Sequence, residues 1–228
     1  HGVRLWANAR SLPELNYENP AVKEFIFAQP DSVVRTYLRS GIDGWRLDTA
    51  FELGFQVLHE LTQAAHEEKP GSLVVGEIWS YPQDWFPALD AVMNFTLREI
   101  ILNSLQEKIS PRAANEMIDR MIADAGIEPI LKSWVLLDNH DVARLTNTLP
   151  DPADRALAQV LQFTLPGSPN LYYGSELGME GGTDPANRAP MRWDLAHAGN
   201  PVYCWVKKLI ELRKKHRALR IGDFRKLV

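Results

Sequence analysis

The chain alternates short, almost continuous apolar runs with longer amphipathic segments, and this alternation constrains its fold more than any other feature. Such short runs are typical of strands buried on both faces, and the longer segments are typical of helices that connect parallel strands. We expect strands at 44–48, 73–77, 91–95, 134–140 and 170–174. We expect helices at 20–40, interrupted at Pro30, and at 53–68, 97–108, 111–124, 152–164 and 201–217. The pattern predicts an α/β fold with a parallel sheet.

Charge and composition exclude several classes of partner. The formal net charge is −4 and the two signs are interspersed, so we expect no nucleic acid partner and no membrane-binding surface. No apolar run approaches the length of a membrane span. The lone Cys204 cannot form an internal disulfide and does not indicate a compartment. Localisation therefore stays open, with a soluble, cytoplasmic protein slightly favoured. The charge pattern indicates an uncharged partner.

Three of the five expected strands end in a carboxylate or directly before one. These residues are Asp48, Glu77 and Asp141. In an α/β barrel the carboxyl ends of the strands build the active site, so acids at these positions converge on one mouth of the barrel. One such strand would be unremarkable, but three indicate a common site.

The first two acids fit the requirements of glycosidic bond cleavage, which needs a proton donor and a carboxylate at the sugar carbon. Arg46 and Asp48 are two residues apart on one strand, so both point to the same side, and the guanidinium favours the ionised form that a nucleophile requires. Glu77 ends an apolar run, and these surroundings favour the protonated form of an acid. The alternatives are a buried Arg–Asp pair that stabilises the barrel and a solvated Glu at a helix start.

Several segments resemble the conserved motifs of the α-amylase family, glycoside hydrolase family 13. GIDGWRLD, VVGEIW and LLDNHD resemble its second, third and fourth motifs, LPELN resembles the motif preceding them, and PGSPNLYYGSELGM resembles the one on the last barrel strand. The resemblance covers essentially the whole chain and implies a (β/α)8 barrel. It also implies that Asp48 is the nucleophile, Glu77 the acid/base, and Asp141 the carboxylate that binds and distorts the sugar, supported by Arg46 and His140.

Two further segments, AVMNF and EGGTDPANRAPMRWD, resemble the cyclomaltodextrinase, neopullulanase and maltodextrin glucosidase branch of that family. The resemblance implies that Asp184 and Arg188 bind the sugar next to the cleavage point and that Asn94 also contacts substrate. A loop salt bridge between Asp184 and Arg188 is an equally open interpretation. Trp79 either stacks on a glucose ring or forms the wall that desolvates Glu77.

No cofactor and no metal site are expected from this segment. The pair His140–Asp141 lacks the further spaced ligands that a metal site needs. Calcium sites occur in some members of the family that the chain resembles, but nothing in this sequence indicates one.

The chain departs from the family pattern at its start. The family's first motif and the first three strands are absent, so residues 1–220 are expected to be the C-terminal part of the barrel, from the third βα connection to the eighth helix. Residues 221–228 are expected to begin a following β domain. The N-terminal strands would come from a second chain or from a missing segment of the same enzyme. After Asp48, residues 49–52 read Thr-Ala-Phe-Glu where the branch often has Val-Ala-Asn-Glu, which leaves acceptor-side specificity open.

The resulting hypothesis is a retaining glycoside hydrolase that acts on α-glucosidic bonds, mainly α-1,4, in maltodextrins, cyclodextrins or related α-glucan oligosaccharides. A transglycosylase or a sugar isomerase on the same barrel is the nearer alternative. A non-catalytic, amylase-like binding subunit is the other, and the retention of all three acids argues against it.

Overall fold

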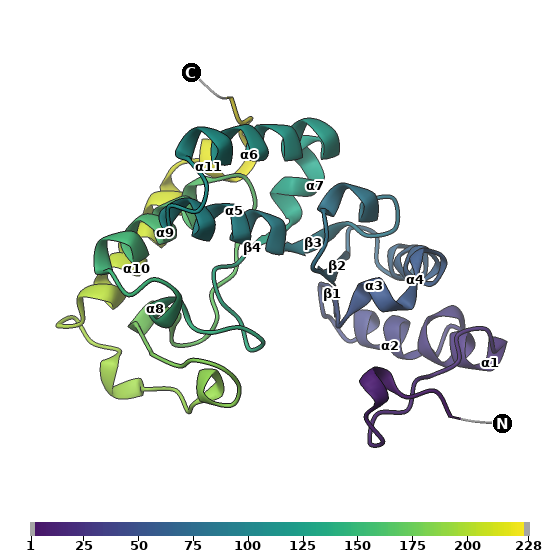
Figure 1. Ribbon diagram of the computed structural model, residues 1–228. Helices are drawn as coiled ribbons and strands as arrows, with labels where there is room; N and C mark the ends of the chain where they lie inside the picture. Colours follow the sequence, from purple (N-terminus) through teal and green to yellow (C-terminus); the bar gives the residue numbers. More distant parts are fainter. Residues whose placement is uncertain (1–2, 226–228) are drawn as a thin grey trace.

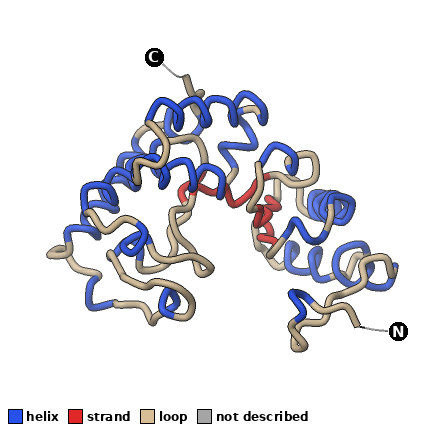
Figure 2. The backbone as a smooth tube through the Cα atoms, in the orientation of Figure 1, coloured by secondary structure: helices blue, strands red, loops and turns tan. Residues whose placement is uncertain are grey.

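The computed structural model describes residues 3–225, in which five strands form one parallel sheet in chain order. The strands are β1 (Gly44–Leu47), β2 (Leu73–Ile78), β3 (Ala91–Asn94), β4 (Trp134–Val135) and β5 (Ser168–Pro169). They run side by side near the centre of the molecule, and helices lie along the outer side of the sheet (Figures 1 and 2). The structure confirms the predicted α/β class with a parallel sheet.

Helices follow the strands along the chain, as expected for βα units. The α-helices are α1 (Pro20–Lys23), α2 (Val33–Arg39), α3 (Ala50–Leu53), α4 (Phe55–Glu68), α5 (Phe95–Leu105), α6 (Pro111–Ala125), α7 (Ile127–Lys132), α8 (Leu145–Thr148), α9 (Pro152–Thr164), α10 (Pro201–Lys215) and α11 (Ala218–Ile221). The 3-10 turns are η1 (Trp6–Asn8), η3 (Pro82–Trp85), η4 (Ser175–Leu177), η5 (Ala186–Arg188) and η6 (Trp193–Leu195), and η2 (Glu24–Ala28) is a π-helix.

Four helices begin with the same N-cap arrangement. Asn19, Ser110, Asp151 and Asn200 each accept a backbone N–H from the first turn of the helix that follows, and each is followed by proline. A side-chain oxygen at this position satisfies a free N–H group, and proline loses nothing at the first helical position because its missing N–H would be unpaired there. These residues therefore fix where α1, α6, α9 and α10 start.

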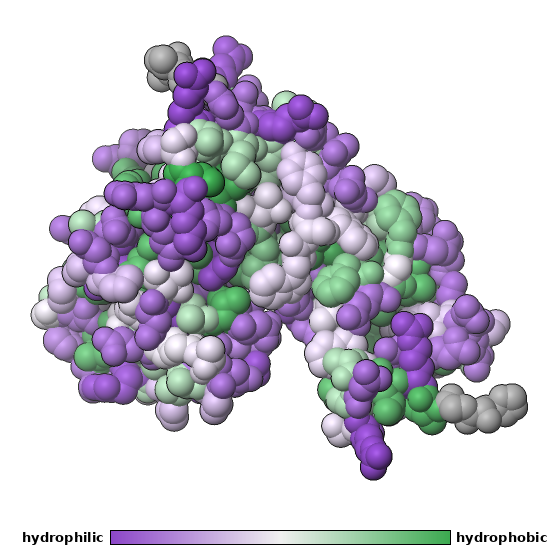
Figure 3. Space-filling model, in the orientation of Figure 1, coloured by the Kyte–Doolittle hydropathy of each residue, from purple (hydrophilic) through white to green (hydrophobic). Residues whose placement is uncertain are grey.

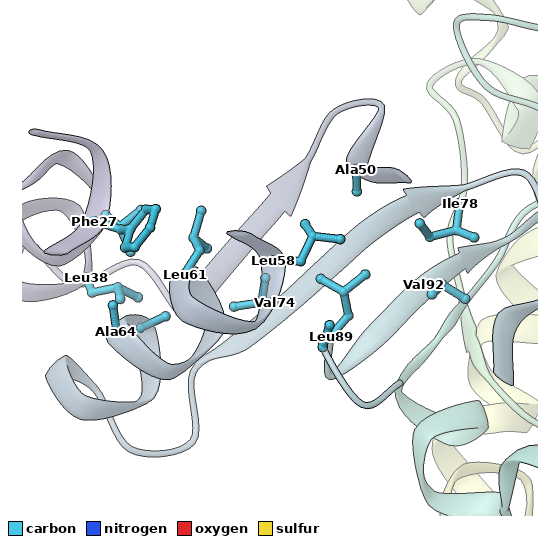
Figure 4. Packing of buried hydrophobic residues seen from close by; sticks show 13 residues of the cluster. Phe27, Leu38, Ala50, Leu58, Leu61, Ala64, Val74, Ile78, Leu89 and Val92 are labelled. Atoms are coloured by element: carbon cyan, nitrogen blue, oxygen red, sulfur yellow. The ribbon is translucent and has the colours of Figure 1, made fainter. Parts of the chain in front are cut away.

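Successive side chains of each strand point to opposite faces of the sheet. Val74 and Ile78 of β2 belong to one buried cluster with Leu58 and Leu61 of α4 (Figure 4). The intervening Val75 belongs to a different cluster, with Ala91, Met93, Phe95 and Leu136. One face of the sheet is thus covered by helices, and the other carries Val75, Met93 and, at the end of β2, Glu77.

A second helix-covered core lies around β4. Ile101 of α5, Ile118 of α6 and Ile130 of α7 pack with Val135 and Ala158 in one buried cluster. The part of the molecule around α8–α10 is separated from the part around α1–α4 by a notch in the space-filling view (Figure 3). Among the described residues β1 pairs only with β2 and β5 only with β4, so the five strands form an open arc rather than a closed barrel.

The last two predicted strands differ most from the structure. The apolar run 134–140 forms strand only at 134–135, because the chain then turns toward α8, and Asp138 accepts the backbone N–H of Leu145. The fifth strand lies at 168–169 and not at 170–174. Tyr172 and Tyr173 contribute to packing instead of to a strand, since the guanidinium carbon of the buried Arg144 lies 4.6 Å and 4.8 Å from the centroids of their rings.

The end of the chain differs in part from the expectation. Residues 218–221 form α11, and residues 222–225 contain no strand. Residues 226–228 lie outside the described residues, so the start of a following β domain at 221–228 stays a prediction. Between residues 3 and 225 no helix is long and apolar enough to cross a membrane.

Candidate active site

The guanidinium of Arg46 joins the first two predicted catalytic carboxylates. Strands β1 and β2 pair with Leu47 opposite Gly76, so Asp48 and Glu77 follow at neighbouring positions. Nη2 of Arg46 donates to Oε2 of Glu77 at 2.9 Å, and Nη1 donates to Oδ1 of Asp48. The structure therefore brings Arg46, Asp48 and Glu77 together at the carboxyl ends of two adjacent strands.

The two carboxylates have different surroundings. The side chain of Glu77 is 4% exposed, whereas that of Asp48 is 72% exposed. The backbone N–H of Thr49 donates to Oε2 of Glu77 at 2.9 Å, and Nε1 of Trp79 donates to Oε1 at 3.0 Å. Three donors, from Arg46 in β1, Thr49 in the turn after β1 and Trp79 directly after β2, thus hold the Glu77 carboxyl group in place, while Asp48 stays accessible to a bound molecule.

Trp79 is held on one side by a second aromatic ring. Its indole stacks on Phe95, with ring centroids 3.8 Å apart and an interplanar angle of 17°. The ring is exposed to solvent, and its N–H reaches Glu77. The structure thus shows direct contact with the acid, and stacking on a glucose ring stays a prediction.

Asp141 lies in a second cluster, built from the loop after β4 and from η5. Nε2 of His140 is 3.1 Å from its Oδ2, and Nη2 of Arg188 is 3.3 Å from its Oδ1. Arg188 also reaches Oδ2 of Asp184 at 3.3 Å. The loop salt bridge considered from the sequence is therefore present, and the same guanidinium extends it to Asp141.

Asn94 is the predicted site residue that lies in neither cluster. Its side chain is buried, and its Oδ1 accepts the N–H of Leu97 at 2.9 Å as the N-cap of α5. Its Nδ2 lies 3.6 Å from the sulfur of Met121. These contacts give Asn94 a structural role, and substrate contact by Asn94 stays a prediction.

The two clusters share no hydrogen bond or ion pair within residues 3–225. In the same residues no group of three His, Cys, Asp or Glu side chains is placed to hold a metal ion. The expectations about calcium and cofactors therefore stay predictions. Chemically, the first cluster offers one exposed and one buried carboxyl group joined by a guanidinium, and the second offers a carboxylate flanked by cationic or hydrogen-bonding groups.

Asp138 lies apart from both clusters, in the interior. Burial raises its pKa, and the carboxylate accepts the N–H of Leu145 and the hydroxyl of Ser175. Asp138 and Ser175 border a largely apolar pocket between α9 and α10 that contains none of the three predicted catalytic acids. The pocket is therefore separate from the candidate active site.

The α-amylase catalytic-domain family model matches residues 4–202. The chain belongs to the α-amylase family. It is 34% identical to a cyclomaltodextrinase from Bacillus sp over 218 residues, which cover 94% of this chain and 38% of that protein. It is 35% identical to neopullulanase 2 from Thermoactinomyces vulgaris, covering 94% of this chain and 37% of that protein.

Solved structures of the α-amylase family superpose closely on the chain. The cyclic α-maltosyl-(1→6)-maltose hydrolase from Arthrobacter globiformis matches with a TM-score of 0.89 and 28% identity, covering 95% of this chain and 49% of that one. A cyclomaltodextrinase matches with a TM-score of 0.87 and 32% identity, covering 96% of this chain and 38% of that one. These matches confirm the predicted family and a partial barrel, and the chain spans less than two fifths of the curated relatives named above.

Two residues with evident roles around the candidate site were not predicted as site residues from the sequence. Thr49 was noted only as a departure from the family pattern, yet its backbone N–H binds Glu77. Asn187 is completely buried beneath the second cluster and donates to the backbone on both sides of Asp141. Neither role has a sequence signal, because one depends on a backbone angle and the other on contact between distant loops.

Proposed function

We propose that the chain carries part of the active site of a retaining glycoside hydrolase. The enzyme would cleave α-glucosidic bonds, mainly α-1,4, in maltodextrins, cyclodextrins or related α-glucans through a covalent glucosyl-enzyme intermediate. The observation that carries this proposal is the single guanidinium of Arg46 in contact with both Asp48 and Glu77. A retaining enzyme needs two carboxyl groups close together, one of them a nucleophile.

The roles follow from accessibility and contacts. Asp48 is exposed, so its carboxylate would attack the anomeric carbon while Glu77 donates a proton to the departing oxygen. Water would then attack the glucosyl-enzyme, with Glu77 accepting its proton. Asp141 would hold the sugar at the cleavage point, with Arg188 and Asp184 beside it.

The proposal includes completion of the barrel by strands outside this chain. Among the described residues, β1 pairs only with β2 and β5 pairs only with β4, so each has an open edge. A barrel of this kind has eight strands and closes on itself. We use the term barrel-complete protein for this chain together with the strands that close its sheet, whether they belong to the same polypeptide or to a second one.

The decisive experiment is Glu77→Gln in the barrel-complete protein. The substitution removes the proton donor and keeps the shape, so turnover of maltotriose should fall by at least about a hundredfold while binding is largely preserved. Glu60→Gln is a control, since Glu60 forms an ion pair with Lys23 at 2.6 Å, away from the site. Near-normal turnover by the Glu77 variant would disprove the acid assignment. If the unsubstituted protein converts maltotriose into products longer than maltotriose, it is a transglycosylase instead.

A further inference from the structure

The buried side chain of Asn187 connects two loops of the second cluster. It is 0% exposed, and its Nδ2 donates to the carbonyl oxygen of His140 at 2.8 Å and to that of Val142 at 3.0 Å. These two carbonyls lie on either side of Asp141 in the chain. The amide of Asn187 therefore holds the backbone segment that carries Asp141.

The ends of this segment are held by Arg98, which donates to the carbonyl oxygen of Leu137, and by Gly181, whose carbonyl oxygen accepts the N–H of Arg144, whereas the part around Asp141 has few other backbone contacts. Residues 136–144 lie between β4 and α8 and form no helix or strand, so their position depends on contacts with other parts of the chain. The backbone N–H of Asp141 binds Oδ1 of Asn139, which is within the same segment. The contacts from Asn187 come instead from η5, more than 40 residues further along the chain.

The neighbouring Arg188 adds to the same connection. Its Nε donates to the carbonyl oxygen of His140 at 3.0 Å, and its Nη2 reaches Asp141. The His140 carbonyl thus accepts one bond from Asn187 and one from Arg188. Since Asn187 and Arg188 are adjacent, a shift of the Asn187 amide would move the guanidinium and the carboxylate relative to each other.

We propose that Asn187 is a positioning residue that sets the Asp141 carboxylate between His140 and Arg188. This proposal rests on the proposed function for its effect on catalysis. Asn187 itself does not touch the sugar, because its side chain is completely buried. Its effect is exerted through Asp141, whose carboxylate must keep a fixed position relative to the bound sugar, and small displacements of such groups reduce rates strongly.

The first test is a double-mutant cycle in the barrel-complete protein. Asn187→Ala should lower kcat/KM on an activated aryl α-maltoside by at least about tenfold, because Asp141 is displaced. On an Asp141→Asn background, the same change should lower kcat/KM by less than about twofold, because the group through which it acts is already lost. A merely structural role would produce the same loss on both backgrounds and would overturn the proposal.

Asn200 provides a matched control. It is also buried, and its Nδ2 also donates to two backbone carbonyls, those of Leu177 and Leu195, each at 3.0 Å. Asn200 also caps α10 through its Oδ1, so Asn200→Ala should destabilise the fold at least as much as Asn187→Ala and leave kcat/KM unchanged when both variants are folded. Asn187→Asp keeps the shape but cannot donate to the two carbonyls when ionised, so its loss of activity should equal or exceed that of the alanine variant.

A second readout does not depend on catalysis. The imidazole ¹³Cε1 resonance of His140 should shift in Asn187→Ala and stay in place in Asn200→Ala, since only the former releases the His140 backbone. An unchanged His140 resonance would overturn the positioning role whether or not the protein hydrolyses maltodextrins. A shifted resonance in a protein without hydrolytic activity would keep the positioning role and reject the proposed function.

Discussion

The backbone N–H of Thr49 donates to Oε2 of Glu77 at 2.9 Å, so the residue directly after Asp48 holds the carboxyl group of Glu77. Thr49 has φ 39° and ψ 44°, in the left-handed region that β-branched residues rarely adopt. Such a conformation is strained and persists where surrounding contacts enforce it. The turn after β1 thus links the predicted nucleophile to the predicted acid.

Replacing Thr49 with glycine tests this interpretation. Glycine adopts the left-handed region without strain and keeps the N–H, so we expect kcat/KM in the barrel-complete protein to stay within about twofold. Relief of strain should exceed the entropic cost of glycine and raise the unfolding free energy by about 1 kcal/mol. Denaturant unfolding measures the unfolding free energy, and maltotriose kinetics measure kcat/KM. A tenfold loss of activity would show that the threonine side chain itself takes part.

Replacing Arg46 with lysine should separate the two carboxylates. The guanidinium contacts Asp48 through Nη1 and Glu77 through Nη2, and a single ammonium group cannot reproduce this fork. We expect kcat/KM to fall by at least about a hundredfold because the two groups lose their common support. Arg35→Lys is the control, since Arg35 pairs with the exposed Glu67 at 2.7 Å. Equal activity of both variants would contradict the role of the bridge.

The stereochemistry of the first product tests the retaining mechanism. If Asp48 and Glu77 act as nucleophile and acid/base, their carboxyl groups should lie roughly 5–5.5 Å apart in the reacting complex, too close for a water molecule to attack directly. The first product released from maltotriose should therefore be the α-anomer. Proton NMR during the first minutes of reaction measures it, and an initial β-anomer would rule out both the mechanism and the role of Asp48.

The sequence was sufficient to predict that Asp48 and Glu77 lie at strand ends, whereas Asp141 lies in the loop after β4 and not at the end of a strand. Burial on both faces makes β2 and β3 nearly continuous apolar runs, and the helix-covered faces give the helices their periodicity. Arg46 and Asp48 were expected to share a side of β1, and the structure shows their contact. These features depend on local pattern, which is why they could be predicted.

Features that depend on distant contacts could not be predicted. Tyr172 and Tyr173 suggested a strand because they are apolar, but they surround the guanidinium of Arg144. The role of Asn187 depends on two loops meeting in space, and no short-range pattern encodes that meeting.

The buried Asp138 should give the protein a characteristic pH dependence of stability. Burial raises its pKa above the ordinary 3.8, against the lowering effects of Leu145 N–H, Ser175, Arg144 and Arg98. The unfolded chain therefore ionises first, so this group's contribution to stability is full below about pH 3.8 and is lost as pH rises through the folded-state pKa. The substitution Asp138→Asn replaces the carboxyl group with an amide that cannot ionise, so it removes this pH dependence.

We therefore expect the Tm of the wild type to fall relative to that of Asp138→Asn as pH rises from about 4 to about 7. Thermal unfolding of both barrel-complete proteins, followed by circular dichroism across this range, measures the difference. Asp43→Asn is a useful contrast, because Lys69 holds the pKa of Asp43 below its usual value. Any change with pH in the Tm difference between wild type and Asp43→Asn should therefore have the opposite sign. A constant Tm difference between wild type and Asp138→Asn would contradict the prediction.

The 228 residues alone should be neither stable nor active, because the sheet has two open edges. Unpaired N–H and C=O groups at the outer sides of β1 and β5 would accept strands from other molecules. Large apolar side chains are also exposed near the β1 side of the molecule, among them Phe25, Tyr37 and Phe55. We expect this chain expressed alone to aggregate, and size-exclusion chromatography with light scattering measures this directly.

Supplying the strands that close the barrel should reverse both defects. Pairing at β1 and β5 removes the open edges, which is the general reason that closed barrels resist edge-to-edge association. Co-expression with a polypeptide that carries those strands should yield a soluble complex that hydrolyses maltotriose, and the same complex with Glu77→Gln should be soluble and inactive. This pair of results separates failure to fold from failure of catalysis. If the 228 residues alone form a soluble monomer that unfolds cooperatively and hydrolyses maltodextrin, the five strands suffice and barrel completion is not required.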